Sequence, residues 1–314
     1  MAVRTPPVPR SDDRTMKIFA KGWSMNKDGP GHRRIYYLKG CNLRCLWCAS
    51  PESISADDEL LFYPDRAAVD EKPDFLCPHG AISGKNLDRA VCRKCVNKEC
   101  RSLHHRCLVW AGENVTVDEI CRELEACRKM WGNLAGVTFG GGEPALQSGE
   151  LLKLFNKLRK LNIHTAFESN AVPEGFKDLV RAADLVITDL KAGSPETFFR
   201  CTGGNLDTVI RHHLYAAERA GDLLIRIPLI PTLNDSKDEF FAMLAILEKL
   251  NGTRILNHGE PLAVELLKFH HFGQAKYAAL GIAYPAAALP DVSAEKIAEY
   301  QNILAQSGIR VVES

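Results

Sequence analysis

The stretch Gly40-Cys41-Asn42-Leu43-Arg44-Cys45-Leu46-Trp47-Cys48 places three cysteines on one short loop, with the spacing C-x3-C-x2-C. It follows Ile35-Tyr36-Tyr37-Leu38, an apolar run typical of a strand. Three thiolates can hold three corners of a cubic iron–sulfur cluster and leave the fourth iron without a protein ligand. A zinc site needs a fourth ligand, so we favour a cluster over zinc or chance buried cysteines. The loop therefore predicts an open iron that can bind and activate another molecule.

The chain beyond residue 115 alternates between strand-like and helix-like segments. Strand-like runs occur at residues 136–139, 163–167, 185–187, 223–230 and 262–267. Capping boxes at residues 116–119 and 236–239 each begin a helix with an apolar face. About six such repeats predict an α/β fold with a parallel sheet, and they are too few for an eight-fold barrel. We therefore expect a partial (β/α)6 barrel.

Polar residues and glycines follow the predicted strands, where the carboxyl ends of parallel strands gather ligands. These positions are Cys41–Cys48, Gly140–Glu143, Glu168–Asn170, Asp189 with Lys191, and His270. The glycine run would let a ligand approach the backbone closely. The alternatives are a plain turn at the glycines, a solvated charge pair at Asp189 and Lys191, and a satisfied histidine at residue 270. All these residues follow a predicted strand, as the cysteine loop does, and this shared position favours one ligand pocket.

Composition narrows the class of protein. The 314 residues are 46% hydrophobic and carry a formal net charge of +1, which gives no sign of a nucleic acid or a membrane as partner. No run of about 18 apolar residues occurs. Residues 1–15 are polar and proline-rich, so we expect a disordered tail rather than a secretion signal, and a cytoplasmic protein. Eleven cysteines without an export signal indicate metal ligands more than disulfides.

Residues 54–112 form a predicted insert between the two parts of the barrel, residues 16–53 and 113–314. The insert carries five cysteines within an irregular, proline-containing sequence: Cys77, Cys92, Cys95, Cys100 and Cys107. We expect ligands, rather than a large apolar core, to hold it together. Cys121, Cys127 and Cys201 are interpreted as small apolar residues.

Further motifs give the chain a specific resemblance. They are Asp28-Gly29-Pro30-Gly31-His32-Arg33, Pro51-Glu52-Ser53, Gly136-Val137-Thr138-Phe139-Gly140-Gly141-Gly142-Glu143, Glu168-Ser169-Asn170, Asp189-Leu190-Lys191, Arg226-Ile227-Pro228, Ile230-Pro231-Thr232-Leu233-Asn234-Asp235 and Phe269-His270. With the cysteine loop, and in this order, they resemble the radical S-adenosylmethionine (SAM) enzymes. The likeness is greatest to the glycyl-radical-enzyme activating enzymes, the family of pyruvate formate-lyase activase. Four positions depart from the family pattern: His32, Ala49-Ser50, Ala171 and Thr232.

The resemblance implies a role for each motif. Cys41, Cys45 and Cys48 would be catalytic as the ligands of a 4Fe-4S cluster whose open iron is chelated by SAM. The residues that would contact SAM are Trp47, Gly141, Gly142, Glu143, Ser169, Asn170, Asp189, Lys191, Arg226 and His270. Glu168 and Asp189 would border a possible monovalent cation. Asp28 would meet the glycine loop of the partner enzyme.

The implied activity is reductive cleavage of SAM to methionine and a 5′-deoxyadenosyl radical, which abstracts a hydrogen from a backbone glycine of a glycyl radical enzyme. A low-potential donor such as flavodoxin or ferredoxin would supply the electron. The first alternative is a radical enzyme that modifies another peptide or a small metabolite. The second is an iron–sulfur electron carrier or a zinc scaffold, which would not need the polar strand ends.

Relatives with an insert usually carry two ferredoxin-type cysteine runs, in which the fourth cysteine of each run binds the other cluster. On this pattern one ferredoxin-like auxiliary 4Fe-4S cluster would be held by Cys92, Cys95, Cys100 and Cys77. The contiguous alternative replaces Cys77 with Cys107. A third interpretation is a zinc site that uses His104 or His105.

Overall fold

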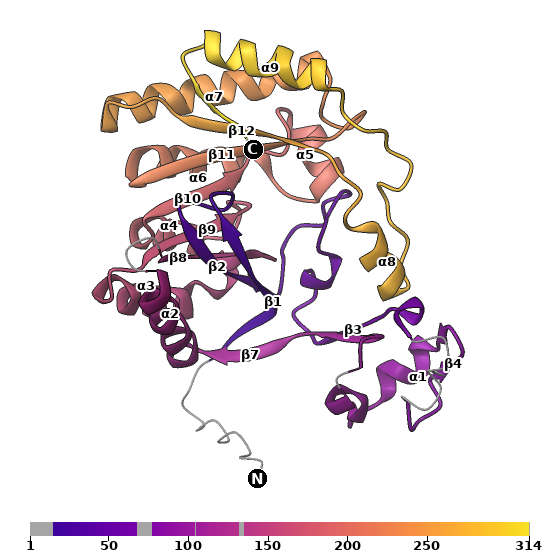
Figure 1. The fold of residues 1–314 in the computed structure, drawn as a ribbon. Helices are drawn as coiled ribbons and strands as arrows, with labels where there is room; N and C mark the ends of the chain where they lie inside the picture. Colours follow the sequence, from indigo (N-terminus) through magenta and orange to yellow (C-terminus); the bar gives the residue numbers. More distant parts are fainter. Residues whose placement is uncertain (1–14, 68–76, 104, 132–134, 314) are drawn as a thin grey trace.

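The computed structural model describes residues 15–67, 77–103, 105–131 and 135–313 (Figure 1). Within these residues, nine strands form one sheet in the order β13-β12-β11-β10-β9-β8-β2-β1-β7. Their bounds are β1 Thr15–Met25, β2 His32–Leu38, β7 Glu113–Thr116, β8 Ala135–Gly141, β9 His164–Ser169, β10 Leu185–Asp189, β11 Asp222–Leu229, β12 Ala263–Lys268 and β13 Arg310–Val312. Neighbouring strands from β2 through β8 to β13 are parallel, which confirms the predicted α/β class with a parallel sheet.

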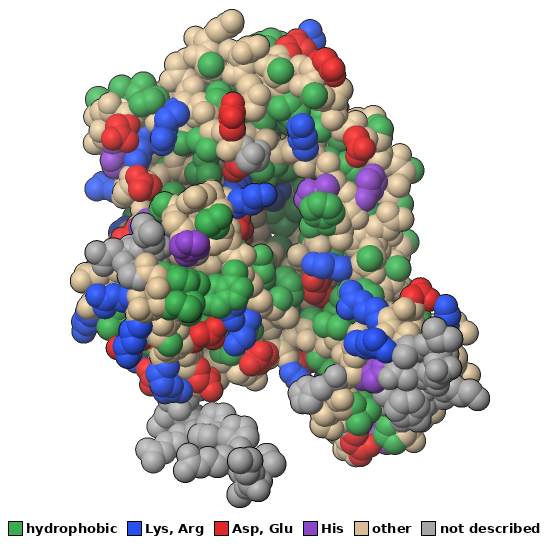
Figure 2. Space-filling model, in the orientation of Figure 1, with side chains coloured by type: hydrophobic (Ala, Val, Ile, Leu, Met, Phe, Trp, Pro, Cys, Tyr) green, Lys and Arg blue, Asp and Glu red, His purple; other side chains and the backbone are tan. Residues whose placement is uncertain are grey.

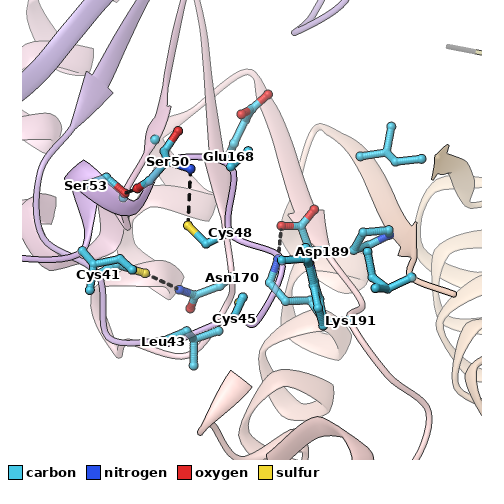
Figure 3. Close-up of a pocket in the computed structure, with 18 of the residues that line it drawn as sticks. Cys41, Leu43, Cys45, Cys48, Ser50, Ser53, Glu168, Asn170, Asp189 and Lys191 are labelled. Carbon is cyan, nitrogen blue, oxygen red and sulfur yellow. Dashed lines mark hydrogen bonds and ion pairs between the residues drawn. The ribbon is translucent and has the colours of Figure 1, made fainter. Parts of the chain in front are cut away.

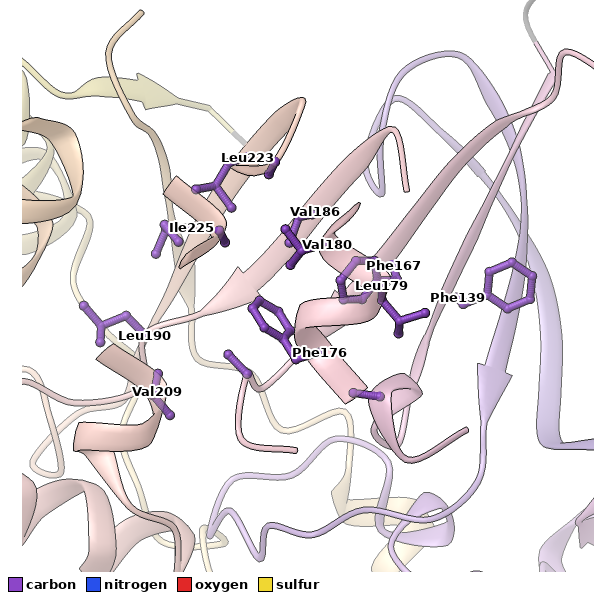
Figure 4. Packing of buried hydrophobic residues seen from close by; sticks show 14 of the residues in the cluster. Phe139, Phe167, Phe176, Leu179, Val180, Val186, Leu190, Val209, Leu223 and Ile225 are labelled. Carbon is purple, nitrogen blue, oxygen red and sulfur yellow. The ribbon is translucent and has the colours of Figure 1, made fainter. Parts of the chain in front are cut away.

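Helices alternate with the strands and pack against the sheet. They are α2 Val117–Trp131, α3 Ser148–Lys160, α4 Gly175–Ala182, α5 Pro195–Thr202, α6 Leu206–Arg219, α7 Lys237–His258 and α9 Ala294–Gln306. The predicted capping box before α2 forms, because Thr116 and Glu119 bond reciprocally. The second box forms only in half: the Ser236 hydroxyl caps α7, but the Glu239 carboxylate accepts from the amides of Gly193 and Ser194 instead. Figure 4 shows the buried side chains between strands and helices, including Phe139, Phe167 and Phe176.

The sheet begins with a strand that the sequence did not predict. β1 runs antiparallel to β2 on one side and to β7 on the other. Residues 1–14 of the predicted tail lie outside the described residues, and Thr15 belongs to β1, where it pairs with Thr116. Only Met16 and Ile18 of this strand are fully buried, so its apolar pattern is too short to identify it.

The insert contains short elements only, as far as it is described. β3 (Glu59–Phe62) and β6 (Leu108–Ala111) form an antiparallel pair, as do β4 (Ile82–Ser83) and β5 (Asn86–Leu87). They are joined by α1 (Arg89–Lys94) and by 3-10 turns. β3 packs against α8 (Gln274–Leu280), a short helix from the other end of the chain (Figure 1).

A search of the described helices finds none that is both long and apolar enough to cross a membrane.

Candidate active site

The cysteine loop is fixed at its start and in its middle by backbone hydrogen bonds. At its start, the amides of Gly40 and Cys41 donate to the carbonyls of Ser53 and Ile54, at 2.7 and 3.1 Å. In its middle, the Leu46 amide donates to the carbonyl of Cys201 at 3.0 Å. The chain therefore returns to the base of the loop directly after the third cysteine. The loop needs no disulfide to hold its shape, and the cysteines remain free thiols.

The glycine run after β8 packs against this loop. The Gly142 amide donates to the Leu38 carbonyl and the Glu143 amide to the Gly40 carbonyl, both at 2.8 Å. A Cβ atom on Gly142 would lie 2.3 Å from the Gly40 carbonyl oxygen, and Gly141 has a φ of +99°. Glycine is therefore required so that two backbone segments can approach each other, in addition to its predicted role toward a ligand.

These two segments border a pocket of about 280 Å³ at the carboxyl end of the sheet (Figure 3). Twelve of the residues that line it were predicted from the sequence to hold the cluster, SAM or a cation. They are Cys41, Cys45, Trp47, Cys48, Gly141, Gly142, Glu168, Ser169, Asn170, Asp189, Lys191 and His270. Side chains from five separate strand ends thus converge on one pocket, as the register of the motifs predicted.

Glu143 was predicted to contact SAM, but it does not line the pocket. Its side chain is fully buried and accepts hydrogen bonds from the Ser169 hydroxyl and the amides of Asn170 and Ala145, at 2.7 to 2.9 Å. Burial raises the pKa of Glu143 to about 7, although these hydrogen bonds oppose the rise. The carboxylate joins the end of β8 to the end of β9. Through Asn170, whose side chain reaches Asn42 at 2.9 Å, it also braces the cysteine loop.

Arg226 and Asp28 also lie outside this pocket. They line a second cavity of about 700 Å³ beside the loop between β1 and β2. Arg226 donates to Glu168 and Glu265 at 2.7 Å each, and Asp28 lies 3.6 Å away. Glu168 lines the first pocket, so Arg226 reaches that pocket through its carboxylate. Burial raises the pKa of Glu168 to about 7 against the lowering effect of Arg226.

The pocket is a low-dielectric site for its thiols. Burial raises the pKa of Cys41 to about 11 and that of Cys45 to about 12. Lys191, which pairs with Asp189 at 2.5 Å, opposes the rise at Cys45. Asp189 in turn keeps the pKa of Lys191 above its ordinary value, although burial alone would lower it. Metal ligation requires thiolates, so loading iron here would release protons.

The sequence missed several residues of the site. Leu43, Ala49, Ser50, Ser53, Ile54, Pro228, Ile230, Leu267, Lys268 and Phe269 also line the pocket. Arg33 was noticed only as part of a motif. It is fully buried and donates to Thr138 and the Val137 and Pro30 carbonyls at 2.6 to 3.1 Å, which fixes the loop that carries Asp28. Burial lowers its pKa to about 10. The motif that contains Arg33 does not indicate this role. The only signal in the sequence is that Arg33 lies in a strand that is largely buried.

Cysteines of the insert line a separate small cavity. Cys77, Cys92, Cys95 and Cys100 border it, together with His79 and Trp110. Cys107 is fully buried and is not among the residues that line this cavity. Within the described ranges, no group of three or more His, Cys, Asp or Glu side chains converges tightly enough for a single metal ion. A cubic cluster separates its cysteines by the width of the cluster, so its ligands converge less tightly than those of one ion. The three thiols of Cys41, Cys45 and Cys48 are a donor set that suits such a cluster. His104 of the zinc alternative lies outside the described residues.

The parallel sheet, the three-cysteine loop at its carboxyl edge and the polar strand ends around it define a radical SAM protein. The Radical SAM superfamily profile matches residues 35–244, and the chain belongs to this superfamily.

Curated relatives define the particular branch. The chain is 31% identical over 299 residues to the 4-hydroxyphenylacetate decarboxylase activating enzyme of Clostridioides difficile strain 630, with 90% of each chain covered. It is 31% identical to the benzylsuccinate synthase activating enzyme of Thauera aromatica, which covers 91% of this chain and 88% of the relative. Among solved structures, SuiB of Streptococcus suis, bound to its precursor peptide SuiA, is similar in fold. Its TM-score is 0.50 at 13% identity, over 89% of this chain and 48% of that chain.

Proposed function

We propose that this protein activates a glycyl radical enzyme. The observation that carries the proposal is the single pocket in which three free cysteines meet the glycine loop of β8 and the polar ends of β9 and β10. The relatives that match over most of their length are named as activating enzymes of a decarboxylase and of benzylsuccinate synthase. The enzyme that this chain would activate is a glycyl radical enzyme, like the partners for which these relatives are named.

The residues of the pocket suit the two groups that this function needs. Cys41, Cys45 and Cys48 would hold a 4Fe-4S cluster, and its open iron would face the rest of the pocket. When bound, the cluster and SAM would supply methionine and a 5′-deoxyadenosyl radical after one electron arrives from a low-potential donor such as flavodoxin or ferredoxin. The radical would then take a hydrogen atom from a backbone glycine of the partner.

The remaining side chains orient SAM and exclude water. Gly141 and Gly142 expose backbone to its amino end, and Ser169, Asn170 and Lys191 offer hydrogen bonds and charge to its polar groups. Trp47 is largely buried beside Phe269 and provides an apolar surface for the adenine. Glu168 and Asp189 face the same space and are the residues that we assign to a monovalent cation. Asp28 and Arg226 line the neighbouring cavity, on the side where we place the glycine loop.

Anaerobic reconstitution with iron and sulfide, followed by dithionite and SAM, tests the proposal. We expect 5′-deoxyadenosine to form, and a glycyl signal to appear in electron paramagnetic resonance when a candidate glycyl radical enzyme is added. Cys45→Ser should abolish both products, whereas Cys127→Ser, a buried change outside the pocket, should retain them. Absence of 5′-deoxyadenosine would exclude radical chemistry. Its formation without a glycyl signal on any candidate partner would favour a radical enzyme with another substrate.

We also assign the insert, residues 54–112, to one auxiliary 4Fe-4S cluster. One cavity is bordered by Cys77, Cys92, Cys95 and Cys100. This supports Cys77, rather than Cys107, as the fourth ligand. Burial raises the pKa of both Cys92 and Cys100, and the other cysteines of the set add to this effect. Such a cluster would give the external donor a point of entry on the surface.

A further inference from the structure

A third cavity, of about 410 Å³, lies between the barrel and the insert; we call it the lateral cleft. One wall comes from the first two strands of the sheet, one from the β3–β6 pair, and one from the segment that follows β12. Its apolar lining includes Phe19, Tyr37, Leu61, Tyr63, Val109 and Phe272. Two parts of this rim are exposed, because Phe272 is 76% and Val109 39% accessible. The cleft is thus an open groove with aromatic and aliphatic walls.

The lateral cleft lies directly beside the active site. Ala49 and Ser50, which directly follow Cys48, line both cavities. Phe19 and Tyr37 pack together with ring centroids 5.7 Å apart, and a Cβ on Gly141 of the active-site pocket would lie within 3 Å of both side chains. On the opposite wall Phe272 stacks on His270, another residue of that pocket, at 4.0 Å. A chain lying in the cleft would therefore run beside the active-site pocket, with Ala49 and Ser50 between them. Figure 2 shows a hollow near the centre of this face.

Charged groups occur at one place in the lining of the cleft. Lys276 of α8 pairs with Glu52 at 2.7 Å and lies 3.4 Å from the Ser50 hydroxyl. Glu52 is 4% exposed, and among the described residues its Oε2 atom has no hydrogen-bond partner. The ion pair with Lys276 stabilises this buried carboxylate. The cleft thus combines apolar walls with a single ion pair, between Lys276 and Glu52.

We propose that the lateral cleft binds the residues next to the target glycine of the partner enzyme as an extended segment with an apolar side chain. This inference rests on the proposed function, because it supposes that the substrate is a protein chain. A glycine has no side chain for recognition, so its neighbours must supply specificity. The walls from β3 and β6 make the insert part of the substrate site as well as a cluster scaffold. Val109, Tyr63 and Phe272 are then specificity-determining residues.

Short synthetic peptides with one central glycine, flanked by leucine or by aspartate, test the cleft by fluorescence anisotropy with the cluster-loaded enzyme and SAM. We expect the leucine peptide to bind at least about tenfold more tightly, since burying one leucine side chain is worth about 1.5 to 3 kcal/mol. Val109→Asp and Phe272→Ala should remove most of this preference. SAM cleavage without peptide should be unchanged in Val109→Asp, because Val109 does not line the active-site pocket.

Leu256→Asp is the matched control for Val109→Asp, because Leu256 is 84% exposed on α7 and lies outside the cleft. Equal binding of the two peptides, or an unchanged preference in Val109→Asp, would overturn the inference even if a partner enzyme acquires a glycyl radical normally. Conversely, selective peptide binding without a glycyl radical on any partner would refute the proposed function and leave the cleft as a peptide site.

Discussion

Ala171 and Thr232 adopt left-handed backbone, with φ of 57° and 66°. Both stand where the activating enzymes that the sequence resembles commonly have glycine, so the structure gives a physical meaning to these departures. A left-handed conformation costs an L-residue about 1 to 2 kcal/mol, and a β-branched residue such as threonine tolerates it poorly. The chain keeps the turn at Thr232 because its amide donates to the Asp235 carboxylate at 2.8 Å.

Thr232→Gly should therefore stabilise the protein. The substitution relieves the left-handed strain and keeps the amide bond to Asp235, while the added flexibility of the unfolded chain offsets part of the gain. We expect the free energy of unfolding to rise by up to about 1 kcal/mol in urea denaturation. Thr253→Gly within α7 is the control and should lose about 0.3 kcal/mol, the difference in helix propensity between threonine and glycine. A loss of equal size in Thr232→Gly would show that the strain is absent.

Glu143 should make stability depend on pH. Its pKa is about 7 in the folded protein and near 4.5 when unfolded, so between these values the native state binds a proton that the unfolded state lacks. Stability should thus fall as pH rises from about 4.5 to about 7, by on the order of 1 to 3 kcal/mol. In urea titrations of the cluster-free protein, Glu143→Gln should flatten this slope. The exposed Glu299→Gln should keep the wild-type slope.

The sequence identified the pocket residues better than it identified their orientation. Asp189, Lys191 and Asn170 were placed by their position after a strand, and the pocket brings them together. Glu143 follows a strand in the same way, but its carboxylate turns to the amides of the adjoining loop. Nothing in a motif distinguishes a side chain that faces a ligand from one that satisfies buried backbone donors.

Among the elements, α8 was not predicted because it is only seven residues long. It nevertheless contacts both the cysteine loop of the active site and the insert. At its N-terminal end, a Cβ on Gly273 would lie 2.7 Å from the Cys48 carbonyl oxygen. At its C-terminal end, the Ala279 carbonyl accepts from Arg89 of the insert. Such a role depends on contacts between residues about 190 apart in sequence, which local patterns cannot reveal.

The insert should lose its cluster when Cys77 is replaced. Because Cys77 borders the same cavity as Cys92, Cys95 and Cys100, we expect Cys77→Ser to retain about four fewer iron atoms per chain than wild type. Cys107→Ser should keep the full iron and sulfide content, as should Cys127→Ser, the control in α2. Iron and sulfide assays after anaerobic reconstitution measure the cluster content of each variant. Iron loss in Cys107→Ser alone would support the contiguous ligand set instead.

At the scale of the whole molecule, the alternation of strands and helices was sufficient to predict the parallel sheet. Each parallel strand lies beside the preceding one in the chain from β8 to β13, so the local pattern implied the global order. The antiparallel edge was not predictable in this way. β1 joins β7 by pairing Thr15 with Thr116 across the whole insert, and a pairing of such long range has no local signature.

The first and last strands of the insert are hydrogen-bonded to each other, with Glu59 opposite Ala111. The entry and exit of this segment therefore stand side by side, and its length is decoupled from the architecture around it. The free energy of closing a loop depends only weakly on its length. Related proteins can therefore have a longer, shorter or different segment between these two strands without a change in the order of strands in the sheet. The β3–β6 pair is therefore a position where the segment between the two strands can vary in length while the parallel sheet and its pocket stay the same.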